Sequence, residues 1–163
     1  MNIIYYCFAG AHASVVASAI HCGLLSIDRT PEAQEFLAID YYDSTLPELI
    51  GRPYFMGCDK GGHHIYFMGM WNQRANITST IRTVLALGGW KQEDYILQDA
   101  FPLINFSIKF GGLLSKRWRF TNFGRSLTIW GMRRQYPAFV KIVEEVQLII
   151  TILETQNEDK LDK

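Results

Sequence analysis

A short apolar run near the N-terminus limits the folds open to this chain more than any other feature. Residues 3–8 read Ile-Ile-Tyr-Tyr-Cys-Phe, without a charged residue. A run of this length, rich in β-branched and aromatic residues, is typical of a strand buried on both faces. Small residues follow from Ala9 to Ala13, interrupted only by His12, and apolar residues then recur at helical spacing until Gly23. A buried strand, a small-residue turn and a helix predict an α/β domain.

The rest of the pattern predicts a mostly parallel sheet between layers of helices. Further strands are expected at 53–57, 64–70, 95–98 and 127–130, and further helices at 30–37, 77–87, 101–114 and 137–153. The glycine-containing segment between the first two of these strands predicts a hairpin. We therefore expect a three-layer α/β fold, Rossmann-like or P-loop-like, with an added antiparallel hairpin. Residues 1–153 would form one domain, and 154–163 a polar, frayed tail.

Composition narrows the class of protein. The chain has 163 residues, 48% of them hydrophobic, and no net charge. This size suits one globular domain, and zero net charge disfavours nucleic acid as a partner while permitting a homo-oligomer. The three cysteines form no CxxC pair and the N-terminus has no basic signal-like region, so we expect reduced thiols and a cytoplasmic protein. No apolar run reaches the roughly 18 residues of a transmembrane segment.

The turn after the first strand is the leading candidate for a ligand site. Ligands of open α/β sheets bind beyond the carboxyl ends of the strands, and a helix N-terminus favours an anion. Gly10 and Ala11 would allow a ligand to approach the backbone closely, and Ser14 could donate a hydrogen bond to the ligand or cap the helix. His12 is the candidate catalytic residue, as acid, base or phosphoacceptor. These features predict binding of a phosphate-bearing small molecule or nucleotide, with phosphoryl transfer or hydrolysis as the reaction if there is one.

Known phosphate-binding motifs do not match this turn. The P-loop lysine is absent, Gly10 stands alone where a dinucleotide fingerprint has three glycines, and Ala13 replaces the arginine of a Cys-x₅-Arg loop. The small residues have a second interpretation, which is close packing of strand and helix, with Ser14 as a plain N-cap and His12 as a surface residue. The ligand hypothesis therefore depends on topology more than on motif.

Three other residues are candidates for ligand binding. Arg52 or Arg125 could close over a bound anion, and Asp99 directly follows an expected buried strand. Asp99 has an equally good interpretation as a turn former before Pro102. Cys58, Asp59 and the His63-His64 pair lack zinc spacing, so no metal site is predicted.

A basic, aromatic stretch supports a different function. No Asp or Glu occurs from Ala100 to Val143, and bases and aromatic residues alternate across 109–134. Such a surface suits a non-catalytic interaction protein that contacts a partner protein or a membrane-bound complex. The other interpretation is that these charges balance the first half of the chain, where residues 1–70 hold seven acids and three bases.

Several motifs resemble an uncharacterised family of short α/β proteins from spore-forming bacteria. Residues 5–17 read Tyr-Tyr-Cys-Phe-Ala-Gly-Ala-His-Ala-Ser-Val-Val-Ala, and weaker matches are Gly124-Arg125-Ser126 and Gly131-Met132-Arg133-Arg134. The resemblance covers the chain to about residue 147. It implies a shared fold, fits a role in sporulation, and leaves cofactor and activity unknown.

Overall fold

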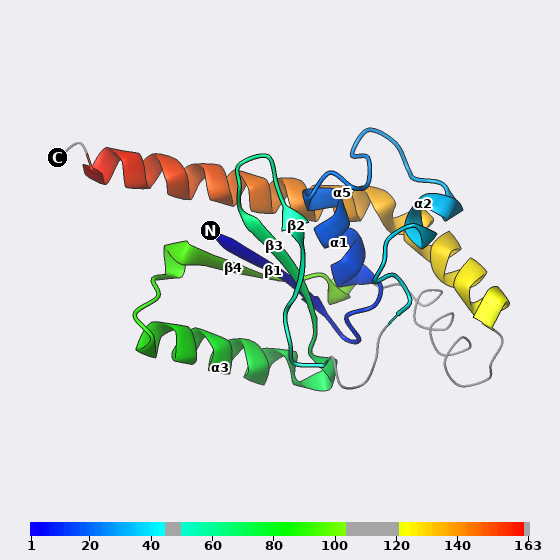
Figure 1. Ribbon diagram of the computed structural model, residues 1–163, viewed down its shortest axis with the longest axis horizontal. Helices are drawn as coiled ribbons and strands as arrows, with labels where there is room; N and C mark the ends of the chain where they lie inside the picture. The colour runs from blue at the N-terminus through cyan, green and yellow to red at the C-terminus, as the bar shows by residue number, and fades with distance from the viewer. Residues whose placement is uncertain (45–49, 104–120, 162–163) are drawn as a thin grey trace.

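The computed structural model describes residues 1–44, 50–103 and 121–161, and its centre is one four-stranded sheet (Figure 1). The strand order is β2-β3-β1-β4, with β1 parallel to both neighbours and β2 antiparallel to β3. The mixed α/β class and the antiparallel hairpin are thereby confirmed. The strands are β1 (Asn2–Cys7), β2 (Tyr54–Cys58), β3 (His64–Gly69) and β4 (Tyr95–Asp99).

Helices lie on both faces of this sheet (Figure 1). The helices α1 and α5 pack together over one face, and α3 lies on the other. They are α1 (Ala13–His21), α2 (Ala33–Leu37), α3 (Arg74–Leu87) and α5 (Thr121–Leu161), with short 3₁₀ turns η2 (Trp71–Gln73), η3 (Gln92–Asp94) and η4 (Phe101–Leu103). In the described part of the chain no helix is long and apolar enough to cross a bilayer.

The central strand β1 is fully buried on one face only. Ile3, Tyr5 and Cys7 are at most 1% exposed beneath α1, whereas Ile4 and Tyr6 are partly exposed on the face toward α3. The expectation of burial on both faces is therefore half correct. The reason is that the two helices cover the two faces of the sheet unequally. All nine residues of α1 are buried, whereas no residue of α3 is.

The long helix α5 contradicts two expectations. Its buried residues follow a heptad spacing through Ile129, Met132, Tyr136, Phe139 and Val143, with Pro137 inside the helix. The strand expected at 127–130 is wrong, because these residues belong to α5. The local β-branched pattern favours a strand, but Ile129 is the first buried residue of the helical seam, and this packing determines the structure. The frayed tail is also wrong, because the helix continues to Leu161. The helix expected at 101–114 begins as η4, and its remainder lies outside the described residues.

The carboxyl ends of three strands meet at one edge of the sheet. In the parallel registers Cys7 pairs with Gly69 of β3, and Tyr6 pairs with Asp99 of β4. After β1 the chain forms β2 and β3, which lie on one side of β1 in the sheet. It later forms β4, which lies on the other side of β1. The end of β1 is thus the point where the strand order reverses.

Candidate ligand site at the end of the central strand

The turn between β1 and α1 (residues 8–12) lies against β3. Gly10 has a φ of +66°, and a Cβ placed there would come within 2.7 Å of the backbone nitrogen of Gly69. Both the left-handed conformation and this contact require glycine. Gly10 therefore has a structural reason to be present, independent of any ligand.

Five successive backbone N–H groups at the start of α1 find no acceptor among the described residues. The first intrahelical bond runs from the Val16 nitrogen to the His12 oxygen, at 2.8 Å. The N–H groups of residues 11–15 have no hydrogen-bond partner within the described chain, while Gly10 donates to the Cys7 sulfur at 3.2 Å. Residues 10–21 are all buried. Buried backbone donors in proteins are almost always paired, so this group needs an acceptor.

Ser14 does not cap the helix. The N-cap residue is His12, which makes no side-chain cap bond, and Ser14 lies inside α1. The Ser14 hydroxyl is completely buried and lies 3.1 Å from the Cys7 sulfur. The capping role considered for Ser14 is therefore wrong, because His12 occupies the N-cap position, two residues before Ser14.

His12 and Arg125 meet on one carboxylate. His12 Nε2 lies 3.2 Å from Asp43 Oδ1, and Arg125 donates from Nε to Asp43 Oδ2 at 2.9 Å. The Asp43 side chain is only 5% exposed. Burial acts to raise the pKa of Asp43, but the hydrogen bonds from His12 and Arg125 outweigh it and hold the pKa below its usual value.

The segment that carries Asp43 closes over the turn. The Asp43 N–H donates to the Ala11 oxygen at 3.0 Å, and the ring of Tyr42 meets the His12 ring edge-on at 5.4 Å. Asp43 holds a left-handed backbone, with φ +59°. As a result His12 is only 8% exposed, so its interpretation as a surface residue is also wrong.

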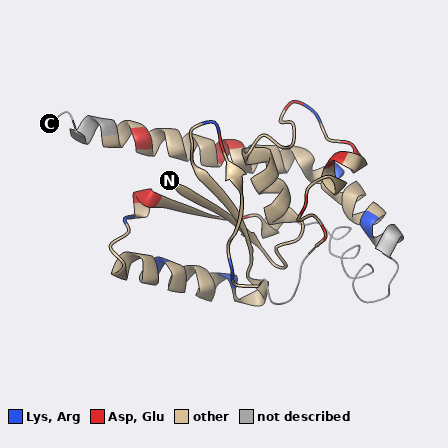
Figure 2. Ribbon diagram, in the orientation of Figure 1, with Lys and Arg blue, Asp and Glu red and all other residues tan. Residues whose placement is uncertain are grey.

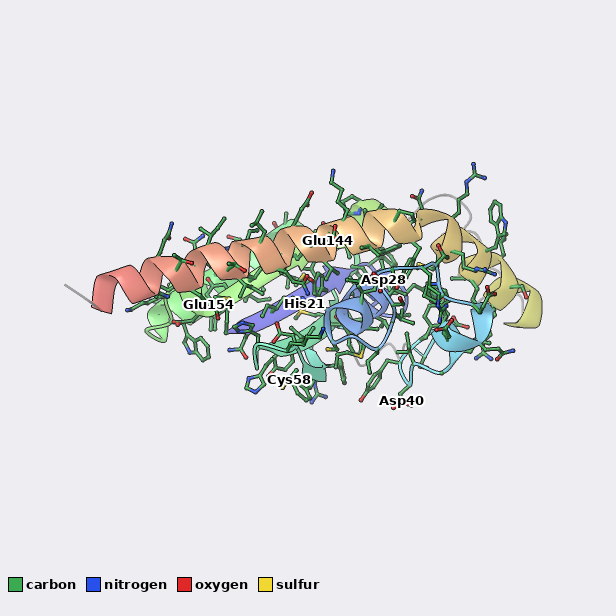
Figure 3. The ribbon with its side chains drawn as sticks, turned by 90° about the horizontal axis from the view of Figure 1, so that it is seen from above. His21, Asp28, Asp40, Cys58, Glu144 and Glu154 are labelled. Carbon is green, nitrogen blue, oxygen red and sulfur yellow. The ribbon has the colours of Figure 1, made fainter. Side chains whose placement is uncertain are left out.

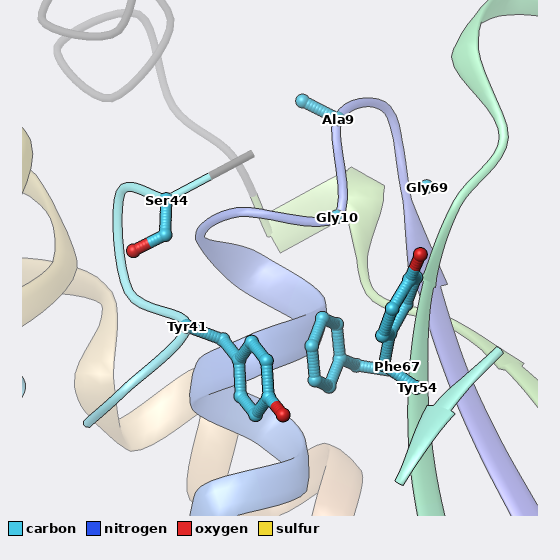
Figure 4. Close-up of a pocket in the computed structure, with 7 residues that line it drawn as sticks. All are labelled: Ala9, Gly10, Tyr41, Ser44, Tyr54, Phe67 and Gly69. Atoms are coloured by element: carbon cyan, nitrogen blue, oxygen red, sulfur yellow. The ribbon is translucent and has the colours of Figure 1, made fainter. Parts of the chain in front are cut away.

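A small cavity lies beside the turn (Figure 4). Its volume is about 10 Å³, and aromatic rings of Tyr41, Tyr54 and Phe67 line it together with Gly10. This is room for about one water molecule. A larger ligand must displace part of the lining.

The remaining candidate residues lie elsewhere. Asp99 belongs to the opposite face of the sheet, where it accepts from Arg74 Nε at 3.3 Å and from the Phe101 N–H at 2.9 Å. Its register with Tyr6 fixes that face. Arg52 is exposed and has no hydrogen bond or ion pair within the described chain. Neither residue joins the β1–α1 turn.

A second polar cluster connects β1 and α1 with the hairpin. Tyr5 Oη lies 2.8 Å from His21 Nδ1, and His21 Nε2 lies 3.3 Å from Asp59 Oδ2 without hydrogen-bond alignment. Burial, followed by the nearby Asp59 and Cys58, raises the pKa of Cys22 to about 12. Figure 3 labels His21 and Cys58 of this region. No group of three or more potential metal ligands is arranged around a common point in the described residues.

The basic stretch is only partly described, because 104–120 lie outside the described residues. Three of its arginines lie in α5, and each contacts another side chain. Arg125 binds Asp43, Arg133 donates to Glu32 at 3.0 Å, and Arg134 lies over the ring of Trp130. Arg125 and Arg133 thus pair with acids of the first half of the chain, as the charge-balance interpretation expects.

Comparison with known proteins gives a family and no function. A family model described as a protein of unknown function, DUF3189, matches residues 2–148. No curated protein and no solved structure matches the chain.

Proposed function

Because the chain belongs to the DUF3189 family of proteins of unknown function, we propose its function from the site: the β1–α1 turn binds the phosphate group of a small molecule or nucleotide. The observation that carries this proposal is the set of buried N–H groups of residues 11–15, which have no hydrogen-bond partner in the part of the chain that the structure describes. Such donors at a helix N-terminus, together with the positive end of the helix dipole, suit a phosphate.

The topology supports the same position. In open α/β sheets, ligands bind beyond the strand ends where the strand order reverses. The order β2-β3-β1-β4 places the end of β1 at that point. We propose that this chain uses the position as Rossmann-like and P-loop-like folds do, with backbone donors in place of a lysine.

Asp43 acts as an internal anion in this proposal. Its carboxylate accepts from His12 and Arg125, the two side-chain donors that a phosphate would also engage. The ligand takes these donors, and the segment around Asp43 swings away from the turn. This movement is needed because the adjacent cavity, at about 10 Å³, has room for only about one water molecule. The left-handed backbone of Asp43, which costs about 1 kcal/mol, favours its release.

A reaction at this site is the second candidate, favoured by the contact between His12 and Asp43. A carboxylate that orients an imidazole prepares it for proton transfer. In this second candidate Asp43 keeps its hydrogen bond with His12 when the ligand binds. Phosphoryl transfer or hydrolysis then uses His12 as acid, base or phosphoacceptor. The two candidates differ in the role of Asp43, so one substitution separates them.

The experiment is thermal unfolding in the presence of inorganic phosphate, pyrophosphate and a panel of nucleotides. We expect at least one to raise Tm with the logarithm of its concentration. His12→Ala should remove this shift, and Asp43→Asn should enlarge it if the carboxylate competes with the ligand. If Asp43 instead orients His12, Asp43→Asn keeps binding and loses turnover of the same compound.

Arg133→Gln is the matched control, because Arg133 also lies on α5 and also pairs with an acid of the first half, away from the turn. It should leave the ligand-dependent shift unchanged. A panel that leaves the wild-type Tm unmoved at millimolar concentrations would reject anion binding at this turn.

A further inference from the structure

Three aromatic rings form one wall of the cavity beside the β1–α1 turn (Figure 4). Tyr54 of β2 pairs with Phe67 of β3, and their rings stack with centroids 5.6 Å apart and planes 27° apart. Tyr41, from the segment after α2, places its ring centroid 4.9 Å from that of Phe67. Flat apolar surfaces of this kind, close to a few polar groups, suit a ligand that contains a planar ring.

The hydroxyl of Tyr54 is buried and lacks a hydrogen-bond partner in the part of the chain that the structure describes. Figure 4 shows this hydroxyl directed toward the end of the sheet that holds Gly10 and Gly69. Buried hydroxyls in proteins are nearly always hydrogen-bonded. A polar atom of a ligand placed between Tyr54 and the turn would supply the missing partner.

The cavity and the proposed phosphate site meet at Gly10. Gly10 lines the cavity, and it directly precedes the N–H groups of residues 11–15 that would hold the phosphate. Adjacent Cα atoms are only about 3.8 Å apart. One small molecule can therefore contact both places.

The two places differ in charge. The strands β2 and β3, which carry Tyr54 and Phe67, contain no Lys, Arg, Asp or Glu (Figure 2). The turn, in contrast, is beside Asp43 and Arg125. A charged end next to an uncharged aromatic end matches a ligand with an anionic group at one end and a flat ring at the other.

The segment at residues 40–44 already places such a pair of groups there. The Asp43 carboxylate takes the side-chain donors at the turn, and the Tyr41 ring, two residues earlier, lies against Phe67. The Ser44 hydroxyl donates to the carbonyls of Asp40 and Tyr42 at 3.2 and 3.1 Å, which holds the segment together locally. A movement that frees the donors from Asp43 therefore also withdraws the Tyr41 ring from Phe67.

We propose that the ligand of the turn is a phosphate ester that carries a planar aromatic ring. Its phosphate binds the N–H groups of residues 11–15, and its ring replaces Tyr41 against Phe67 and Tyr54. The ring is attached either directly to the phosphate, as in an aryl phosphate, or through a sugar, as in a nucleotide. This inference rests on the proposed function, in the form in which Asp43 gives way to the ligand, and it names the class of that ligand.

The test is isothermal titration calorimetry of the full chain with phenyl phosphate, adenosine monophosphate, ribose phosphate and inorganic phosphate. At least one compound with a ring should bind about tenfold more tightly than both compounds without one, because stacking on aromatic side chains adds affinity. The tighter of the two ring compounds identifies how the ring is attached. If the ring compounds bind no more tightly than ribose phosphate, the inference is overturned and the phosphate site stands. If none of the four binds, the phosphate site is rejected, and the inference with it.

Two variants at the cavity test the place of the ring. Tyr41→Ala removes the competing ring, so it should raise the affinity for the ring compounds about fivefold. Tyr54→Ala should lower that affinity about tenfold, since it removes a stacking surface. Neither variant should change the affinity for inorganic phosphate. A Tyr41→Ala protein that gains no affinity overturns the inference, as does a Tyr54→Ala protein that loses none.

Phe55→Ala is the matched control, because Phe55 follows Tyr54 in β2 and its ring contacts His64 and Tyr66 outside the cavity. It should leave all four affinities unchanged, and circular dichroism should show that every variant is folded. If Tyr54→Ala does not fold, Tyr54→Phe keeps the ring and removes only the hydroxyl. It should weaken binding of the ring compounds about fivefold, through the lost hydrogen bond. Unchanged binding by Tyr54→Phe would then overturn the inference.

Discussion

The two sides of the sheet differ in how completely they are covered. On the side of α1 and α5, residues such as Tyr5, Val15 and Phe139 are fully buried, and the candidate ligand site belongs to this packed layer. On the side of α3, no helix residue is buried and large apolar side chains face solvent. The difference indicates that the packed side supplies most of the stability and positions the candidate site, whereas α3 contributes little to the core.

Truncation of apolar side chains tests this difference most strongly. Phe139→Ala removes a fully buried ring from the α5 seam, and it should lower the free energy of unfolding by about 3–5 kcal/mol. Leu87→Ala on α3 should change it by no more than about 0.5 kcal/mol, because Leu87 is 85% exposed. Urea unfolding followed by circular dichroism measures both. Similar losses at the two positions would show that α3 packs far more tightly than its exposure indicates.

Glycine substitution compares the turn with a surface position. At Gly10 an added Cβ meets the backbone of Gly69 at 2.7 Å and must adopt φ +66°, so Gly10→Ala should cost roughly 2–4 kcal/mol. At Gly89, after α3, φ is +81° but no atom lies within 4 Å of the added Cβ. Gly89→Ala should therefore cost only about 1 kcal/mol. If urea unfolding gave the same loss of free energy for both substitutions, the backbone around Gly10 would have to shift enough to accommodate the methyl group.

The sequence predicted the local part of this architecture well. The start of β1, the small-residue turn and α1 are close to the expected bounds, because one apolar run and one helical repeat determine them. Gly57 and Gly62 lie in the hairpin, whose glycine-containing composition was sufficient to predict the antiparallel pair. Leu127 to Trp130 shows the limit: a β-like sequence became helix because Ile129 packs on distant elements.

The site was less predictable because its partners come from distant parts of the chain. Asp43 approaches His12 across 31 residues, and Arg125 approaches Asp43 across 82. No local spacing in the sequence signals these contacts, and Asp43 is therefore not among the site residues that the sequence predicted. Asp99 was placed at the correct strand end, but strand register put its carboxylate on the opposite face.

Acid sensitivity gives the smallest expected effect, and it tests whether Asp43 holds the packed side closed. The pKa of Asp43 is lowered in the folded chain by His12 and Arg125, despite its burial. A lowered folded-state pKa gives stability that is present above the unfolded pKa of about 3.9 and is lost as pH falls through the folded value. Asp43→Asn should therefore cost about 1 kcal/mol at pH 7, since it removes a charged acceptor.

This cost should shrink below about pH 4, because the wild-type protein loses the same contribution there. Urea unfolding of both proteins from pH 7 to pH 3 measures the convergence. Asp40→Asn is the control: Asp40 is exposed and has no ion pair within the described chain. Its unfolding free energy should follow wild type throughout. If the difference between wild type and Asp43→Asn is the same at pH 7 and pH 3, the carboxylate's charge does not hold the turn closed. Asp43 would then act through its backbone bond to Ala11 alone.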